Sequence, residues 1–243
     1  MSAQLPLSAR LALWFTAWVD DRASLDEARD AVVGDGAAHD VVGLPGRAEP
    51  VPLILALGLL RTEGGTRAAL ALPVPGDPLG LSGPAGFNSA VLDAGEGVVV
   101  DGAGLGLVPH PVGAGVQWTC HPSHAAGQVP DPGEADTGLR QAIRGTADLL
   151  ADLDVARWRP EVADALMDLR RQVDLVFPQA MAPRAVRLAA LSTRCRTIVE
   201  LAMEDDGGSV TARQADARRD ALLPLDRAAR RGLVAACAYP WQG

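Results

Sequence analysis

Apolar residues recur at helical spacing through the first sixty residues of the chain. One face of the first segment, at about residues 8–20, carries Leu7, Leu11, Trp14, Phe15 and Trp18. Ser24 and Glu27 form the S-x-x-E capping box of a second helix, which Gly34 ends. Residues 51–60 are apolar on all sides, so we expect a third, buried helix there.

After residue 67 the pattern changes from helical spacing to that of strands. Residues 68–74, 98–100 and 105–108 are typical of strands, and 116–121 alternate apolar and polar side chains. A short helix at 84–94 lies between the first two strands. Three or four strands with short connections predict a small, mostly antiparallel sheet covered by helices, which is an α+β fold.

Helical spacing returns in the second half of the chain. Apolar residues step by three and four along 139–153, 162–176 and 188–202, and three such helices predict an antiparallel bundle. A shorter helix is expected to start at Thr211, and Pro224 is expected to interrupt it before a last helix.

These patterns predict two domains. We expect an α+β domain at residues 1–122 and an all-helical bundle domain at 137–243. Proline and glycine are concentrated between them, which predicts a linker at 123–136.

Composition narrows the class of protein. The chain has 243 residues, of which 48% are hydrophobic, so it can bury a core. Three cysteines are too few for a disulfide scaffold, and no apolar run reaches the roughly 18 residues of a membrane span. The formal net charge of −8 disfavours nucleic acid as a partner. Without a signal peptide, we expect a cytoplasmic protein with free thiols and no membrane contact.

Histidine and cysteine cluster near the end of the last predicted strand. Cys120, His121 and His124, with His110 nearby, are the weak candidates for a metal site. However, Cys120 and His121 are neighbours on a strand, so their side chains should point to opposite faces of the sheet. We therefore expect no metal and no cofactor.

The segment Gly76–Gly83 is the weak candidate for a catalytic or small-molecule site. Its glycines and prolines fix an unusual backbone path around Asp77. Asp77, Asn88 and Glu96, with Asp93, could line a pocket there, and paired carboxylates can serve as acid and base. The alternative, which we favour, is that Asp77 only shapes a turn before Pro78.

Residues 196–231 resemble a helix-turn-helix in outline, with arginines that could contact phosphates. Those arginines are Arg213, Arg218, Arg219, Arg227, Arg230 and Arg231. Aspartates are interleaved with them, which is typical of a solvated helix surface with pairs three or four residues apart. A DNA-binding regulator therefore stays an alternative that the charge pattern disfavours.

Two stretches resemble a known family. Leu72-Pro-Val-Pro-Gly-Asp-Pro-Leu-Gly-Leu81 and Arg196-Thr-Ile-Val-Glu-Leu-Ala-Met-Glu-Asp-Asp-Gly-Gly208 are similar to segments of uncharacterised proteins from high-GC actinobacteria. The resemblance covers most of the chain. That family has no assigned activity, so the resemblance implies no functional residue.

The sequence alone leaves the function open. We expect a non-enzymatic interaction or regulatory protein that binds itself, as a homodimer, or a protein partner through the helical half. The alternatives are an enzyme or small-molecule binder that uses Gly76–Gly83, and a DNA-binding regulator that uses 196–231.

Overall fold

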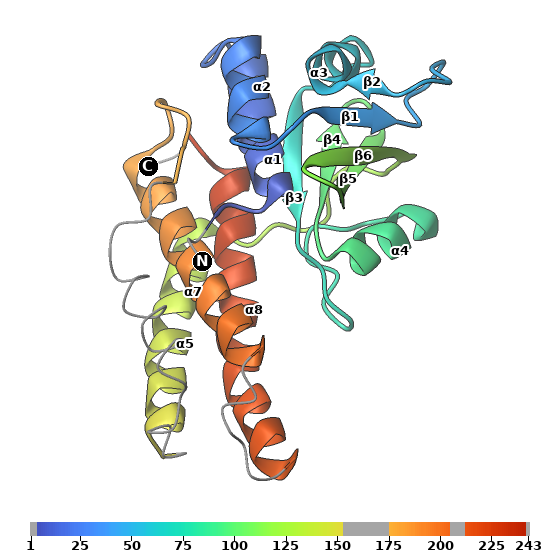
Figure 1. The fold of residues 1–243 in the computed structure, drawn as a ribbon. Coiled ribbons are helices and arrows are strands. Elements are labelled where there is room, and N and C mark those ends of the chain that lie inside the picture. Colours follow the sequence, from blue (N-terminus) through green and yellow to red (C-terminus); the bar gives the residue numbers. More distant parts are fainter. Residues whose placement is uncertain (1–3, 153–174, 205–211, 242–243) are drawn as a thin grey trace. The chain divides into compact units, whose positions relative to one another are not determined.

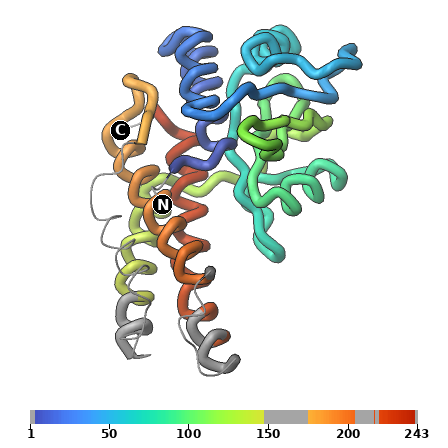
Figure 2. Tube along the Cα trace, viewed as in Figure 1, coloured from blue at the N-terminus to red at the C-terminus, as the bar shows by residue number. Residues whose placement is uncertain are grey.

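The computed structural model describes residues 4–152, 175–204 and 212–241, drawn in colour in Figure 2. The chain forms two compact units. The sheet unit comprises Pro6–Val129, Val176–Ala182 and Cys237–Gly243. The helical unit comprises Met1–Leu5, Pro130–Leu175 and Pro183–Ala236.

The sheet unit is a six-stranded sheet with four helices (Figure 1). Its helices are α1 (Leu7–Val19), α2 (Leu25–Val33), α3 (Leu53–Thr62) and α4 (Ala85–Ala94). Its strands are β1 (His39–Val42), β2 (Val51–Pro52), β3 (Arg67–Ala71), β4 (Gly97–Asp101), β5 (Leu105–Val112) and β6 (Gly115–Pro122). The strand order is β2-β1-β6-β5-β4-β3, and every neighbouring pair is antiparallel except β1 and β6. This confirms the predicted α+β class.

Each face of the sheet carries its own apolar layer. On one face, Ala69, Ala71, Val99 and Val108 form a buried cluster with Leu81 of the following loop and with Phe87 and Val91 of α4. Phe87 lies directly over Gly106 of β5, where a Cβ atom would come within 2.4 Å of the aromatic ring. Leu70, Val98, Leu107 and Cys120 alternate with these residues in the strand register and are buried on the opposite face.

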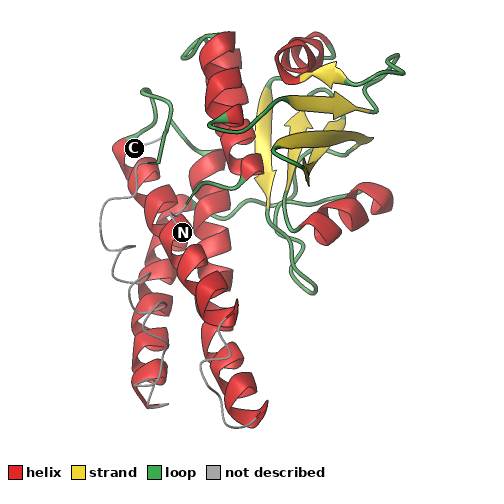
Figure 3. Cartoon of the chain, in the orientation of Figure 1, coloured by secondary structure: helices red, strands yellow, loops and turns green. Residues whose placement is uncertain are grey.

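The helical unit contains α5 (Pro132–Asp152), α7 (Pro183–Glu204) and α8 up to Ala236 (Figure 3). The helices approach closely at Gly232 of α8, where a Cβ would lie 2.4 Å from the Ser192 hydroxyl and 3.6 Å from Leu139. This packing confirms the first and third of the three predicted bundle helices, at 139–153 and 188–202. The second predicted helix, at 162–176, lies almost wholly outside the described residues.

The predicted interruption at Pro224 is wrong, because α8 runs without a break from Ala212 to Ala238. Proline removes one backbone hydrogen bond and crowds the preceding turn, which ends most helices. Here Pro224 is exposed, whereas Leu222 and Leu225 on either side of it are buried. The burial of these two leucines stabilises the helix and offsets the free energy that the proline costs it.

Helix α1 seals the outer edge of the sheet at β3. The hydroxyl of Thr16 donates to the carbonyl of Ala68 (3.3 Å) and accepts from the N–H of the same residue (3.1 Å). An edge strand normally leaves such groups open to another chain. The buried side chain of Thr16 therefore satisfies both backbone groups of Ala68, on the edge of the sheet where the described residues add no further strand.

We predict that Thr16→Val lowers the free energy of unfolding by about 1–3 kcal/mol, because valine keeps the shape but leaves the N–H and C=O of buried Ala68 unpaired. Urea unfolding measures the change. The matched control is Thr62→Val, whose exposed hydroxyl bonds only to Gly58 of its own helix and should cost less than about 0.5 kcal/mol. Equal effects of the two variants would contradict this role of Thr16.

Candidate functional site

The segment around Asp77 is a tight turn. The N–H of Asp77 donates to the carbonyl of Val74 (2.9 Å), and the N–H of Val74 donates back to Asp77 (3.0 Å). Pro75 and Gly76 occupy the two central positions, and Gly76 has φ +83°, as a type II turn requires. Asp77 is the last residue of this turn and is partly exposed.

The rest of the segment is fixed to the chain that follows β6. The N–H of Gly127 donates to Gly80 (3.1 Å), and that of His124 donates to Gly83 (3.0 Å). The hydroxyl of Ser82 also bonds to the carbonyl of Ala125. Gly80 has φ +86°, and a Cβ there would lie 2.7 Å from the carbonyl of Leu70. The loop is therefore a tightly held layer over the sheet.

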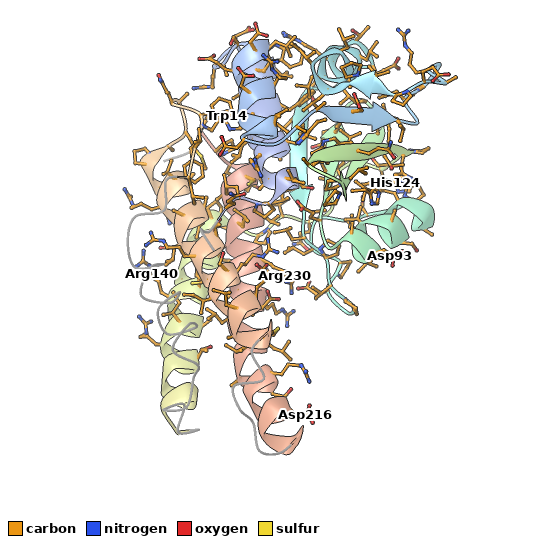
Figure 4. The ribbon with its side chains drawn as sticks, viewed as in Figure 1. Trp14, Asp93, His124, Arg140, Asp216 and Arg230 are labelled. Carbon is orange, nitrogen blue, oxygen red and sulfur yellow. The ribbon has the colours of Figure 1, made fainter. Side chains whose placement is uncertain are left out.

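The polar side chains predicted around this loop serve different parts of the backbone. The amide oxygen of Asn88 accepts from the N–H of Gly83 (3.1 Å). A carboxylate oxygen of Glu96 accepts from the N–H of Ser8 at the start of α1 (2.7 Å). Asp93 lies exposed on α4 (Figure 4). These contacts favour structural roles, and catalysis by Asp77, Asn88 or Glu96 stays a prediction.

Asp101, which the sequence analysis did not single out, joins three segments. One carboxylate oxygen accepts from the N–H of Ala126 (2.9 Å), and the other pairs with Arg67 of β3 (2.8 Å). The sequence offers a weak signal for it, an acid at the end of a strand before the Gly102 turn. Its partners lie 25 and 34 residues away, so local pattern could not identify them.

The metal candidates point in different directions. Cys120 pairs with Leu107 and His121 with Gly106, so the two side chains lie on opposite faces of the sheet, as predicted. The ring of His121 lies 6.1 Å from that of Phe87. Nδ1 of His124 lies 3.1 Å from the carbonyl of Ser82. His110 is exposed on β5, and the described residues contain no group of three His, Cys, Asp or Glu positioned to hold a metal ion.

The three cysteines are free and buried. Burial raises the pKa of the Cys120 and Cys195 thiols to about 11 and raises the pKa of Cys237 further. A protonated thiol is a poor nucleophile, because the thiolate is the reactive form. These residues pack the core.

The arginines of the C-terminal segment are partly neutralised by neighbouring acids. Arg196 pairs with Glu200 (3.3 Å), Arg219 with Asp216 (3.0 Å) and Arg230 with Asp226 (2.8 Å). The Arg230 side chain is only 5% exposed on α8 (Figure 4). The predicted helix-turn-helix outline needs separate helices before and after Pro224. The structure has one continuous helix there, α8, so this part of the outline is absent.

A buried histidine and tryptophan form a polar contact that the sequence analysis missed. The indole N–H of Trp118 donates to Nδ1 of His39 (3.4 Å), and both residues are buried. Burial lowers the pKa of His39, and the positive charge of Arg10 lowers it further, whereas the negative charge of Asp40 raises it. Local sequence could not reveal this contact, because the two residues are 79 positions apart.

We predict that His39 makes stability depend on pH. Its pKa in the folded chain lies below the ordinary value of 6.5, so the unfolded chain takes up a proton first. The free energy of unfolding should therefore be highest above about pH 7 and should fall as the pH drops below about 6.5.

Urea unfolding between about pH 5 and pH 8 measures this slope. His39→Gln should remove its part of the slope, because glutamine can still accept from Trp118 but does not titrate. His110→Gln, at an exposed position, is the control and should keep the slope. An unchanged slope in His39→Gln would show that His39 is not its source.

None of the helices in the described ranges combines the length and apolar character needed to cross a membrane.

Known proteins place the chain in a family. It is 27% identical to the uncharacterized protein Rv1486c of Mycobacterium tuberculosis (strain ATCC 25618 / H37Rv), over 96% of this chain and 97% of that protein. It is also 27% identical to the uncharacterized protein MAV321 of Mycobacterium avium, over 65% of each chain. No solved structure matches it. The model of the N-terminal domain of Rv1486c-like proteins matches residues 8–135, and that of the C-terminal domain matches residues 133–234. The chain therefore belongs to the family of Rv1486c-like proteins.

Proposed function

We propose that this chain is a non-enzymatic interaction or regulatory protein that binds a protein partner or a second copy through its helical half. The observation that carries the proposal is the outer surface of α8 around Leu223. We further propose that residues 1–122 and 137–243 act as separate domains joined by 123–136, and that the protein works in the cytoplasm.

Leu223 is a large apolar side chain that the described part of the chain leaves half exposed. It is 50% exposed on α8, beside exposed Pro224. Exposed charged residues flank it at helical spacing, namely Arg219, Asp220 and Arg227. An apolar centre inside a polar rim is the usual anatomy of a protein–protein contact. The partner that fits it presents an apolar side chain surrounded by charges of both signs.

The alternatives have less support from the described residues. A small-molecule site needs polar groups that are available to a ligand, whereas Asn88 and Glu96 accept hydrogen bonds from the backbone of their own chain. A DNA-binding surface needs arginines available to phosphates, whereas Arg219 and Arg230 pair with aspartates on the same helix.

The test of this proposal is Leu223→Ser in the full chain. We expect it to weaken association about tenfold or more without changing the free energy of unfolding by more than about 0.5 kcal/mol, because the side chain is half exposed. Sedimentation equilibrium measures self-association. For a different partner, a photoreactive residue at position 223 captures the protein in cells, and titration of that purified protein gives the dissociation constant.

A photoreactive residue at Thr137 is the matched control, because this position is exposed on α5 of the same unit. It should not capture the same protein. The proposal fails if Leu223→Ser changes no association. It is replaced by the small-molecule alternative if a metal ion, nucleotide or metabolite raises the melting temperature of the native chain but not that of Asp77→Asn.

A further inference from the structure

Helix α3 is apolar on both sides. Its inner side is buried in the sheet unit through Leu53, Ala56, Leu57 and Leu60. Its outer side, which we call the α3 face, consists of Ile54, Leu55, Gly58 and Leu59. Leu55 is 60% exposed, and Ile54, Gly58 and Leu59 are partly exposed. A helix on the surface of a globular unit normally turns polar residues outward.

Gly58 lies at the centre of the α3 face, and no contact with the described residues requires a glycine there. A Cβ at this position would meet no atom within 4 Å, whereas at Gly106 it would collide with Phe87. Glycine inside a helix costs about 1 kcal/mol relative to alanine. Because glycine has no side chain, another helix can approach α3 closely between Leu55 and Leu59.

The two ends of α3 have opposite electrostatic character. At its start, Pro52 provides no side-chain cap, and the first turn contains no acid. At its end, Glu63 as the C-cap residue places a negative charge at the negative end of the helix dipole, and Arg61 in the last turn places a positive charge there that partly offsets it. The uncapped start and the position of Glu63 are each unfavourable in an isolated helix. Each would be relieved if Glu63 lay beside the start of a second, antiparallel α3.

We propose that the α3 face is the contact between two copies of this chain, with the two α3 helices packed antiparallel about a two-fold axis near Gly58. The same surface then serves both copies, as two-fold symmetry demands. Leu55 and Leu59 pack across the axis, and each Glu63 lies beside the uncapped first turn of the other helix. Figure 1 shows α3 next to the short strand β2, at the end of the strand order.

The size of the α3 face sets the strength of this contact. Two ten-residue helices bury an area at the small end of specific interfaces, so the dimer is weak and reversible. The inference goes beyond the proposed function, because it concerns the sheet unit and names a second copy as the occupant. The two proposals therefore have separate variants, Leu55→Ser here and Leu223→Ser above.

Sedimentation equilibrium of the full chain, over about a hundredfold range of micromolar concentrations, tests the α3 face. We expect a monomer–dimer equilibrium whose dissociation constant rises about tenfold or more in Leu55→Ser and in Gly58→Gln. Leu223→Ser should leave this dissociation constant unchanged, in which case the contact at Leu223 is with a different protein and is measured through the protein captured at position 223. Gly145→Gln is the second control, because Gly145 is also an open glycine inside a helix, and both glutamine variants should raise stability through helix propensity.

Charge variants of Glu63 give an independent readout. Glu63→Lys should raise the dissociation constant more than Glu63→Gln does, although a positive charge at that helix end favours the fold of the single chain. Salt should weaken the native dimer more than the Glu63→Gln dimer.

The inference is overturned if the native chain stays monomeric throughout the range. It is also overturned if Leu223→Ser dissociates the dimer and Leu55→Ser does not, a result that leaves the proposed function standing.

Discussion

The contact of α1 with the open edge of the sheet is the constraint on which the sheet unit depends. Thr16 satisfies both backbone groups of Ala68 on β3, and Glu96 holds the first turn of α1 through the N–H of Ser8. These bonds join residues 52 and 88 positions apart. They position a helix that is buried along most of its length and remove an edge that could pair with another chain.

The same use of polar groups explains the candidate site. Glu96, Asn88 and Asp101 each accept a hydrogen bond from a backbone N–H outside their own helix, strand or loop. Unpaired backbone groups in such places cost free energy, so these side chains stabilise the fold. The two proposed associations rest instead on apolar side chains, Leu55 and Leu223, which are at least half exposed.

Local pattern predicted the elements better than their partners. The capping box of Ser24 and Glu27 is present as predicted, because it involves only residues three apart. The two-residue strand β2 was missed, since it lies inside an apolar stretch that continues into α3. The parallel pairing of β1 with β6 and the contact of His39 with Trp118 were also missed. Both join parts of the chain that only the complete sheet brings together.

The amide of Ala68 tests the role of α1 most directly. Hydrogen exchange measured by NMR under native conditions compares it with the amide of Ala69, the next residue of β3, which the register pairs with Val99 of β4. If α1 closes the sheet, Ala68 exchanges as slowly as Ala69, because both amides open only when the sheet unit unfolds. If Ala68 exchanges orders of magnitude faster than Ala69, the edge of β3 is open and α1 does not hold the unit together.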